Sequence, residues 1–219
     1  MRAWPTPRRS TGTARPRRPG GSSTSATTRR ARIPADELAE VQLQIARTFV
    51  ADGEPEQARV IYTSVIDILE PFQDSSRPVT QRITAPMRLK LAVAQRSYAN
   101  LVKPEDRLDR LRASVDIIRQ LAGDSPDVSL YQIELARSLL DLARLQTLSP
   151  GQENNDAELA SIERNRREQA FAELMGDVLP RLKALLPGNK EVELLEADTY
   201  ASWAQFQGVD SIDPAFEIN

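Results

Sequence analysis

Acidic side chains are the groups of this chain best able to do chemistry, because the sequence contains neither cysteine nor histidine. Their absence excludes thiolate nucleophiles, imidazole bases and the usual protein ligands of zinc. Two clusters of carboxylates could supply a general acid and base instead: Asp124 with Asp127, and Glu191 with Glu193, Glu196 and Asp198. Both clusters stand where helices are expected to begin, and acids in a first turn stabilise the helix dipole. The spacing therefore singles out no catalytic pair.

Other motifs of catalysis and ligand binding are also absent from the sequence. It has no glycine-rich phosphate loop, no calcium-binding loop and no nucleophile elbow. Trp203 and Phe206 could form an aromatic ligand box, but their spacing on a terminal helix predicts core packing instead. We therefore expect a protein that is not an enzyme and that needs no cofactor and no metal.

Charge divides the chain into two segments of opposite sign. Residues 1–34 contain nine arginines and no acidic residue, whereas residues 35–219 hold 20 basic and 31 acidic side chains, a net charge of −11. Trp4 and Ile33 are the only bulky apolar residues of the first segment besides Met1. Such a segment buries too little apolar surface to offset the entropy of ordering. We expect residues 1–34 to be a disordered basic tail.

Three interpretations of this tail remain open. The chain holds 25 arginines but only four lysines, a bias typical of a GC-rich coding sequence. In such a sequence a start codon assigned too early would add residues 1–34 as a non-functional extension. A basic arm would neutralise the phosphates of nucleic acid without a fold of its own. Arginine and serine without acids are also typical of an organellar targeting peptide, although the amphipathic face is missing. Nucleic acid is thus an expected partner only through residues 1–34.

The rest of the chain has the composition and periodicity of a helical domain. Only 5% of all residues are aromatic and nine are glycine, which favours helices over β-sandwiches. From residue 35 onward, apolar residues recur at intervals of three and four, the spacing of one helix face. Seven helices are predicted in this way, with apolar stripes within residues 38–49, 58–69, 83–101, 108–122, 131–142, 171–182 and 192–206. We expect an all-α domain of helical hairpins over residues 35–209 and a C-terminal tail over residues 210–219.

Glycine, serine and proline mark the ends of several predicted helices. Gly53 ends the first helix, and Pro55 begins the second at a position where its missing N–H costs nothing. Ser125 is expected to cap the helix that follows Pro126. Pro180 falls inside the sixth helix and should kink or split it, because an interior proline costs about 3 kcal/mol.

A small residue beside larger apolar neighbours returns on four of the predicted helices. Ala46, Ala94, Ala136 and Ala197 occupy this position. A small side chain lets a second helix approach closely, so its repetition predicts stacked helical hairpins.

Residues 39–72 resemble a tetratricopeptide repeat. The small and large packing positions of that family are matched by Ile45-Ala46, Phe49, Gly53, Ala58, Tyr62 and Val65, while Gln42 replaces the usual tryptophan. Second-helix signatures begin at Ala58, Ala113 and Ala170, at a wider spacing than the family period of about 34 residues. The resemblance implies a right-handed superhelix with a concave peptide-binding face.

The resemblance also implies which residues line that face. In the family, the positions three before, one after and four after each small residue point into the groove. In this chain the corresponding residues are Leu43, Arg47, Val50, Leu91, Gln95, Tyr98, Ile133, Arg137, Leu140, Leu194 and Asp198. An apolar groove with Arg47 and Arg137 on an acidic body would suit an extended peptide with acidic groups. In the alternative interpretation, some of the apolar residues are covered by the next helix and the arginines are solvated.

We therefore predict a non-catalytic scaffold that binds another protein or an extended peptide. Two other functions remain open: a regulatory or sensor segment normally attached to a catalytic domain, such as a bacterial kinase or transcriptional regulator, and a nucleic-acid-binding accessory protein that uses the basic tail. No apolar run approaches about 18 residues, so we expect no membrane span. The lack of a secretory signal favours the cytoplasm.

Overall fold

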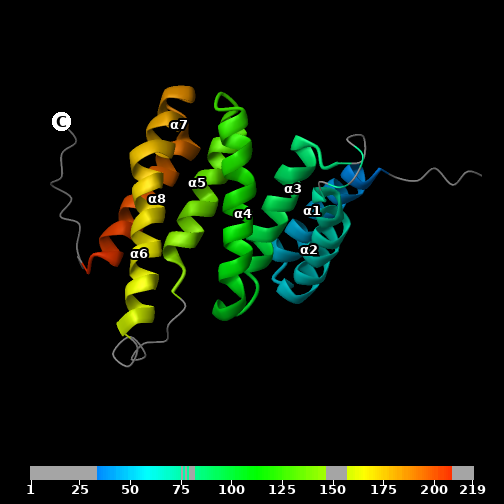
Figure 1. The fold of residues 1–219 in the computed structure, drawn as a ribbon, viewed down its shortest axis with the longest axis horizontal. Helices are drawn as coiled ribbons and strands as arrows, with labels where there is room; N and C mark the ends of the chain where they lie inside the picture. Colours follow the sequence, from blue (N-terminus) through cyan, green and yellow to red (C-terminus); the bar gives the residue numbers. More distant parts are fainter. Residues whose placement is uncertain (1–33, 75, 77, 79–81, 147–156, 209–219) are drawn as a thin grey trace, which may run out of the picture. The chain divides into compact units, whose positions relative to one another are not determined.

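The computed structural model of the protein describes residues 34–74, 76, 78, 82–146 and 157–208, and this part of the chain is all-α (Figure 1). Its helices are α1 (Ala35–Ala51), α2 (Pro55–Leu69), the 3-10 turn η1 (Glu70–Gln73), α3 (Ala85–Ala99), α4 (Pro104–Asp124), α5 (Ser129–Arg144), α6 (Ala157–Glu173), the π-helical segment η3 (Leu174–Val178), α7 (Leu179–Leu185) and α8 (Lys190–Phe206). Since α6, η3 and α7 follow one another without a gap, the described residues form seven helical rods, and the predicted fold class is confirmed.

The predicted tails fall almost entirely outside the described residues. The described residues do not include residues 1–33 of the basic segment, residue 209 of the predicted domain or any of residues 210–219. Pro34 is the first described residue; it is exposed and its carbonyl accepts a hydrogen bond from the N–H of Leu38 at 3.0 Å. The first helix thus begins at Ala35, where the helical domain is expected to start.

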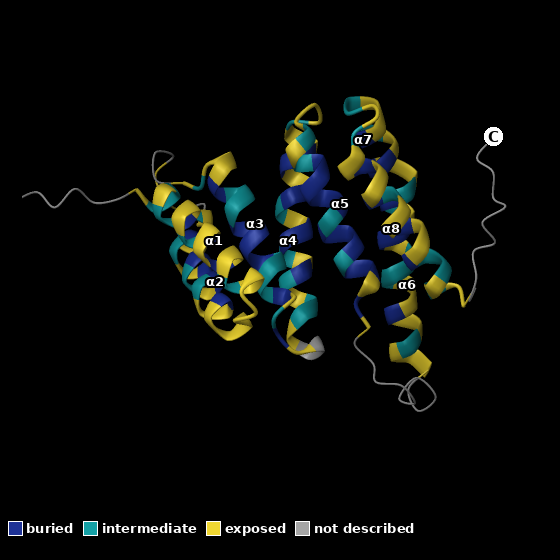
Figure 2. Ribbon diagram, turned by 180° about the vertical axis from the view of Figure 1, so that it is seen from behind, coloured by how far each residue is buried: buried dark blue, intermediate teal, exposed yellow. Residues whose placement is uncertain are grey.

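Helices that are consecutive in the chain pack against each other from α1 through to α6. In addition, α1 contacts α3, α3 contacts α5, and α5 contacts α8. These four helices therefore form one row, and they are the helices that carry the small-residue signature. Figure 2 shows that the buried stretches are concentrated in α3 and α5, in the middle of the row. Ten of the 16 residues of α5 are buried, because α3, α4, α6, α7 and α8 all contact it.

Two hydrophobic clusters form the core. The smaller cluster joins α1 and α2 to one face of α3 through residues such as Leu43, Tyr62 and Leu91. The larger cluster joins the other face of α3 to α4, α5, α6, α7 and α8, with Phe171 at its fully buried centre. The ring of Phe171 packs edge-on against Trp203, with centroids 5.1 Å apart. Trp203 and Phe206 are partly buried and pack against this cluster, so the predicted core packing of the two aromatic residues is met at the edge of the core.

The small alanines lie where the sequence predicts them in three helices of the row. Ala46, Ala94 and Ala136 are all 0% exposed, so each sits at a closely packed interface. The prediction is wrong for Ala197, which is exposed. The buried small residues of α8 are Thr199 and Ser202 instead. This helix is covered by α5 and α7, and Ala197 lies on its open side.

The predicted helix ends agree with the structure except at one cap. Gly53 adopts a left-handed conformation with φ 76° after α1, and Pro55 begins α2. Ser125 does not cap α5: its N–H donates to Leu121 at the end of α4, and its carbonyl accepts from Val128 in a turn. Ser125 therefore ends one helix, and α5 begins four residues later without a side-chain cap.

Pro180 has the predicted effect on the sixth helix. It lacks an N–H to continue the α-helical pattern, and its ring would clash with the carbonyl four residues earlier. The chain accommodates it by widening into the π-helical segment η3, where the N–H of Leu179 donates to the carbonyl of Leu174. A regular helix then resumes as α7, with Pro180 in its first turn.

Candidate peptide-binding groove

Several of the predicted groove residues are buried in the core. Leu43, Leu91 and Ile133 belong to the two hydrophobic clusters. Gln95 is also buried, where its amide donates to Glu70 at 3.0 Å and accepts from Arg110 at 3.1 Å. The prediction that these four side chains face a ligand is wrong, because α3 and α5 are covered by neighbouring helices on several sides.

Three further residues of the predicted groove lie apart from the rest. Arg47 and Val50 are exposed on α1, at the opposite end of the row from α8 (Figure 1). Tyr98 on α3 is partly buried, and the guanidinium of Arg110 lies 5.6 Å from the centre of its ring. The structure therefore does not bring Arg47 together with Arg137.

The remaining four predicted residues come together in one groove. Arg137 of α5 and Leu194 and Asp198 of α8 line a space of about 680 Å³. Leu140 of α5 also contributes to its wall, but it is buried in the larger hydrophobic cluster, so the prediction that it is open to a ligand is wrong. We call this space the α5–α8 groove. Its lining includes seven residues that the sequence did not indicate: Arg96, Asp141, Arg144, Glu191, Leu195, Ala197 and Ala201. A peptide could reach this face without any opening of the core.

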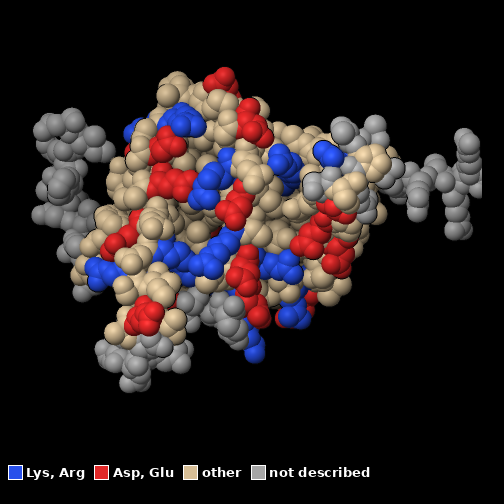
Figure 3. Space-filling model, in the orientation of Figure 1, with Lys and Arg blue, Asp and Glu red and all other residues tan. Residues whose placement is uncertain are grey.

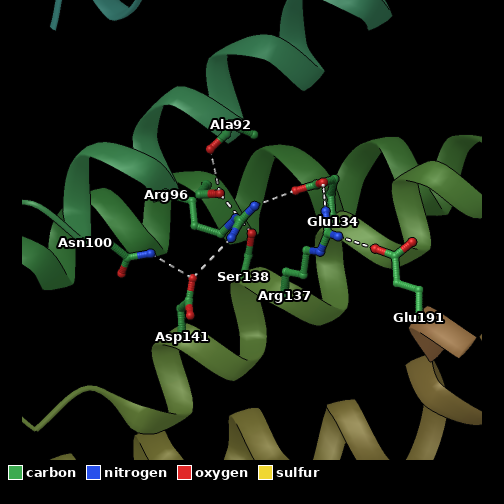
Figure 4. Close-up of polar contacts among 9 residues, drawn as sticks. Ala92, Arg96, Asn100, Glu134, Arg137, Ser138, Asp141 and Glu191 are labelled. Carbon is green, nitrogen blue, oxygen red and sulfur yellow. Dashed lines mark hydrogen bonds and ion pairs between the residues drawn. The ribbon is translucent and has the colours of Figure 1, made fainter. Parts of the chain in front are cut away.

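Ion pairs cross the row of helices at one side of the groove (Figure 4). Arg96 of α3 donates to Glu134 at 2.9 Å and to Asp141 at 3.4 Å, and the amide of Asn100 also donates to Asp141. Glu134 accepts a second guanidinium bond, from Arg137, at 2.7 Å. Two guanidinium groups therefore bind the carboxylate of Glu134, which is almost fully buried. They compensate a negative charge that burial would otherwise leave unpaired.

Two arginines of α5 connect the groove to α8. Arg137 donates to Glu191 (Figure 4), and Arg144 donates to Asp198 at 2.9 Å and to Ser202 at 2.8 Å. Each arginine that lines the groove is thus paired with a carboxylate of the protein. The lining carries three arginines and three acids, so the excess of positive charge expected for an acidic peptide is not present.

A buried polar contact lies beneath these ion pairs. The hydroxyl of Ser114 on α4 donates to the carbonyl of Ala92 on α3 at 2.9 Å, and it lies 3.1 Å from the hydroxyl of Ser138 on α5. Both serines are buried. Since an unpaired buried hydroxyl would be costly, this contact fixes how α3, α4 and α5 sit relative to one another. It thereby positions Arg96 opposite Glu134.

The α8 side of the groove carries apolar side chains between its acidic ones. Leu194 is 72% exposed, and Ala197 and Ala201 follow it at intervals of three and four on the same face of α8. Leu195 of α8 and Leu140 of α5 are both buried and both line the groove, which therefore has an apolar floor. The arrangement offers a hydrophobic strip beside a row of paired charges.

The comparisons with known proteins identify no relative: no protein-family model, no curated protein and no solved structure matches this chain. Among the described residues, no group of histidine, cysteine and acidic side chains is arranged to hold a metal ion. No helix in the same part of the chain has the length and apolar character needed to cross a membrane.

One sequence signal could have indicated the groove more directly. Arg137, Asp141 and Arg144 follow one another at intervals of four and three, so they share one face of an otherwise buried helix. Charged residues on a single face of a central helix indicate the face that remains solvated. Their partners on α3 and α8 lie about 40 to 60 residues away in sequence, and no local pattern connects them.

Proposed function

We propose that this protein is a non-catalytic helical-repeat scaffold of the tetratricopeptide-repeat type and that it holds a segment of another protein in the α5–α8 groove. The observation that carries the proposal is the exposure of Leu194 inside this groove. A single exposed leucine is ordinary on a protein surface. Leu194 differs because Ala197 and Ala201 continue its strip and because ordered charges border it.

The composition of the groove supports a particular kind of partner segment. An apolar side chain of the segment would cover Leu194 and remove its surface from water, which contributes about 25 cal/mol per Å² buried. Polar groups of the segment would meet Arg137 and Glu191, which already pair with each other at the rim. Since this rim is balanced in charge, the segment needs no net negative charge. The proposed partner is an extended peptide with at least one large apolar residue flanked by polar residues.

A selection from a displayed library of random peptides tests the proposal. The protein should enrich peptides that share an apolar anchor, and Leu194→Arg should abolish their binding because it places a charge on the apolar strip. Val60→Arg is the matched control: Val60 is 67% exposed on α2, outside the groove. Its binding should equal that of the wild type.

Both variants change a largely exposed position, so their thermal midpoints should remain close to that of the wild type. Peptides that bind Leu194→Arg as tightly as the unmodified protein would refute the groove as the binding site. A library from which no peptide is enriched would refute the proposed function itself.

A further inference from the structure

A second cleft lies between α4 and α6, on the opposite side of α5 from the α5–α8 groove. Its volume is about 570 Å³, and Leu139 and Leu142 of α5 contribute to its floor. At 100° per residue, these leucines point away from Arg137 and Arg144. Figure 1 shows α4 and α6 on either side of α5. We call this space the α4–α6 cleft, and it is independent of the proposed peptide site.

The acidic residues of the cleft are both bound to one arginine. Arg119 of α4 makes a bidentate pair with Glu173 of α6, at 3.0 and 2.8 Å, and also donates to Asp116 at 3.2 Å. The hydrogen bond to Glu173 raises the pKa of Arg119. Basic and acidic side chains likewise interleave on the face drawn in Figure 3. Asp116 and Glu173 are therefore already neutralised.

Two other arginines of the cleft, Arg112 and Arg166, form no such ion pair with the residues that the structure describes. Arg166 of α6 donates through Nη2 to the carbonyl of Leu145, but its Nε is buried and forms no hydrogen bond within the described residues. Arg112 of α4 is exposed and forms no hydrogen bond or ion pair with the part of the chain that the structure describes. Burial lowers the pKa of Arg166, and the charge of Arg112 lowers it further, while Glu163 acts in the opposite direction. The two guanidinium groups thus repel each other, and the carboxylate that attracts Arg166 is Glu163, which is buried and does not line the cleft.

We propose that the α4–α6 cleft binds a small organic carboxylate, whose oxygens pair with Arg112 and Arg166. Guanidinium groups suit such an oxyanion because their N–H donors match its geometry. The amides of Asn165 and Gln169 also line the cleft and can donate to the same group. Val115 of α4 and the two leucines of α5 form an apolar floor, which accommodates a short hydrocarbon chain.

Titration of the full-length protein with hexanoate tests this site. The Nε–H signal of Arg166 in the nitrogen–proton spectrum should shift and reach saturation, because a carboxylate bound at the rest of the guanidinium changes the electrostatic environment of this buried proton. Arg112→Gln changes an exposed side chain and should fold normally, and it should weaken hexanoate binding about tenfold through the loss of a charge-assisted bond. Arg166→Gln should weaken it at least as much.

Arg164→Gln is the matched control on the same helix. Arg164 is exposed and pairs with Glu168, and it does not line the cleft, so this variant should bind hexanoate as the wild type does. Equal affinity in all four proteins, or the lack of a saturable shift at Arg166, would overturn the proposal. Equally tight binding of hexanol would overturn the role of the carboxylate, and equally tight binding of inorganic phosphate would overturn the role of the apolar floor.

Discussion

Replacement of Ala58 by leucine tests the close packing of the N-terminal helices. Ala58 is 0% exposed in α2, within the cluster that joins α1, α2 and α3. The larger side chain of leucine finds no solvent-filled space there, so neighbouring side chains or the backbone must move. Such overpacking costs about 1–3 kcal/mol. For a protein of this size each kcal/mol shifts the thermal midpoint by about 2–4 °C, so the midpoint should fall by about 2 to 12 °C.

Urea denaturation followed by circular dichroism measures this loss directly, since the denaturation midpoint should fall while the slope stays unchanged. Ala197→Leu provides the control, because it adds the same atoms at an exposed position of α8. Its free energy of unfolding should stay within about 0.5 kcal/mol of the wild type. If Ala58→Leu is as stable as Ala197→Leu, α1 and α2 do not pack as described.

Three further predictions concern the turns, the core and the buried charge. Gly53→Ala should destabilise the protein by about 1 kcal/mol, because the φ of Gly53 is 76°. Gly123→Ala should stabilise it by about 0.5 kcal/mol, because Gly123 lies in helical backbone with open space around it. Equal effects of the two variants in a thermal melt would contradict these backbone conformations. Phe171→Leu should cost about 1–2 kcal/mol in urea denaturation through lost aromatic packing against Trp203, and a neutral result would place Phe171 outside the core. Glu134→Gln should cost about 1–3 kcal/mol because two arginines lose their shared carboxylate, so an unchanged denaturation midpoint would argue against the buried ion pairs.

Much of the helical fold could be predicted because its signals are local. Apolar periodicity identifies each helix, and Gly53 and Pro55 mark a boundary through backbone constraints that act within a few residues. Pro180 predicts a distortion for the same reason. Ser125 shows the limit of local signals: its type suits a helix cap, but it lies at the end of α4, and α5 begins only four residues later. Competition between two neighbouring helices cannot be read from either one alone.

The candidate groove was harder to predict because it depends on which helix faces are covered. Leu43 and Leu194 hold equivalent positions in the predicted pattern, yet Leu43 is buried and Leu194 is exposed. The difference arises from neighbours: α1 packs against α2 and α3, whereas the strip of α8 around Leu194 faces a groove. The cleft that holds Arg112 and Arg166 also brings together side chains more than 50 residues apart. That these two arginines line one cleft appears only in three dimensions.

Helix α3 separates the core into two parts, and this division affects how the fold opens. Leu91 and Ala94 belong to the smaller cluster, whereas Ala92 and Ala99 belong to the larger one. Detachment of α1 and α2 therefore breaks only the smaller cluster, and α3 stays anchored to α4 and α5. Partial unfolding of this kind costs less free energy than global unfolding. It leaves the face of α3 that carries Leu91 and Ala94 exposed to water until the two helices pack again, so this face is the first part of the core that solvent reaches.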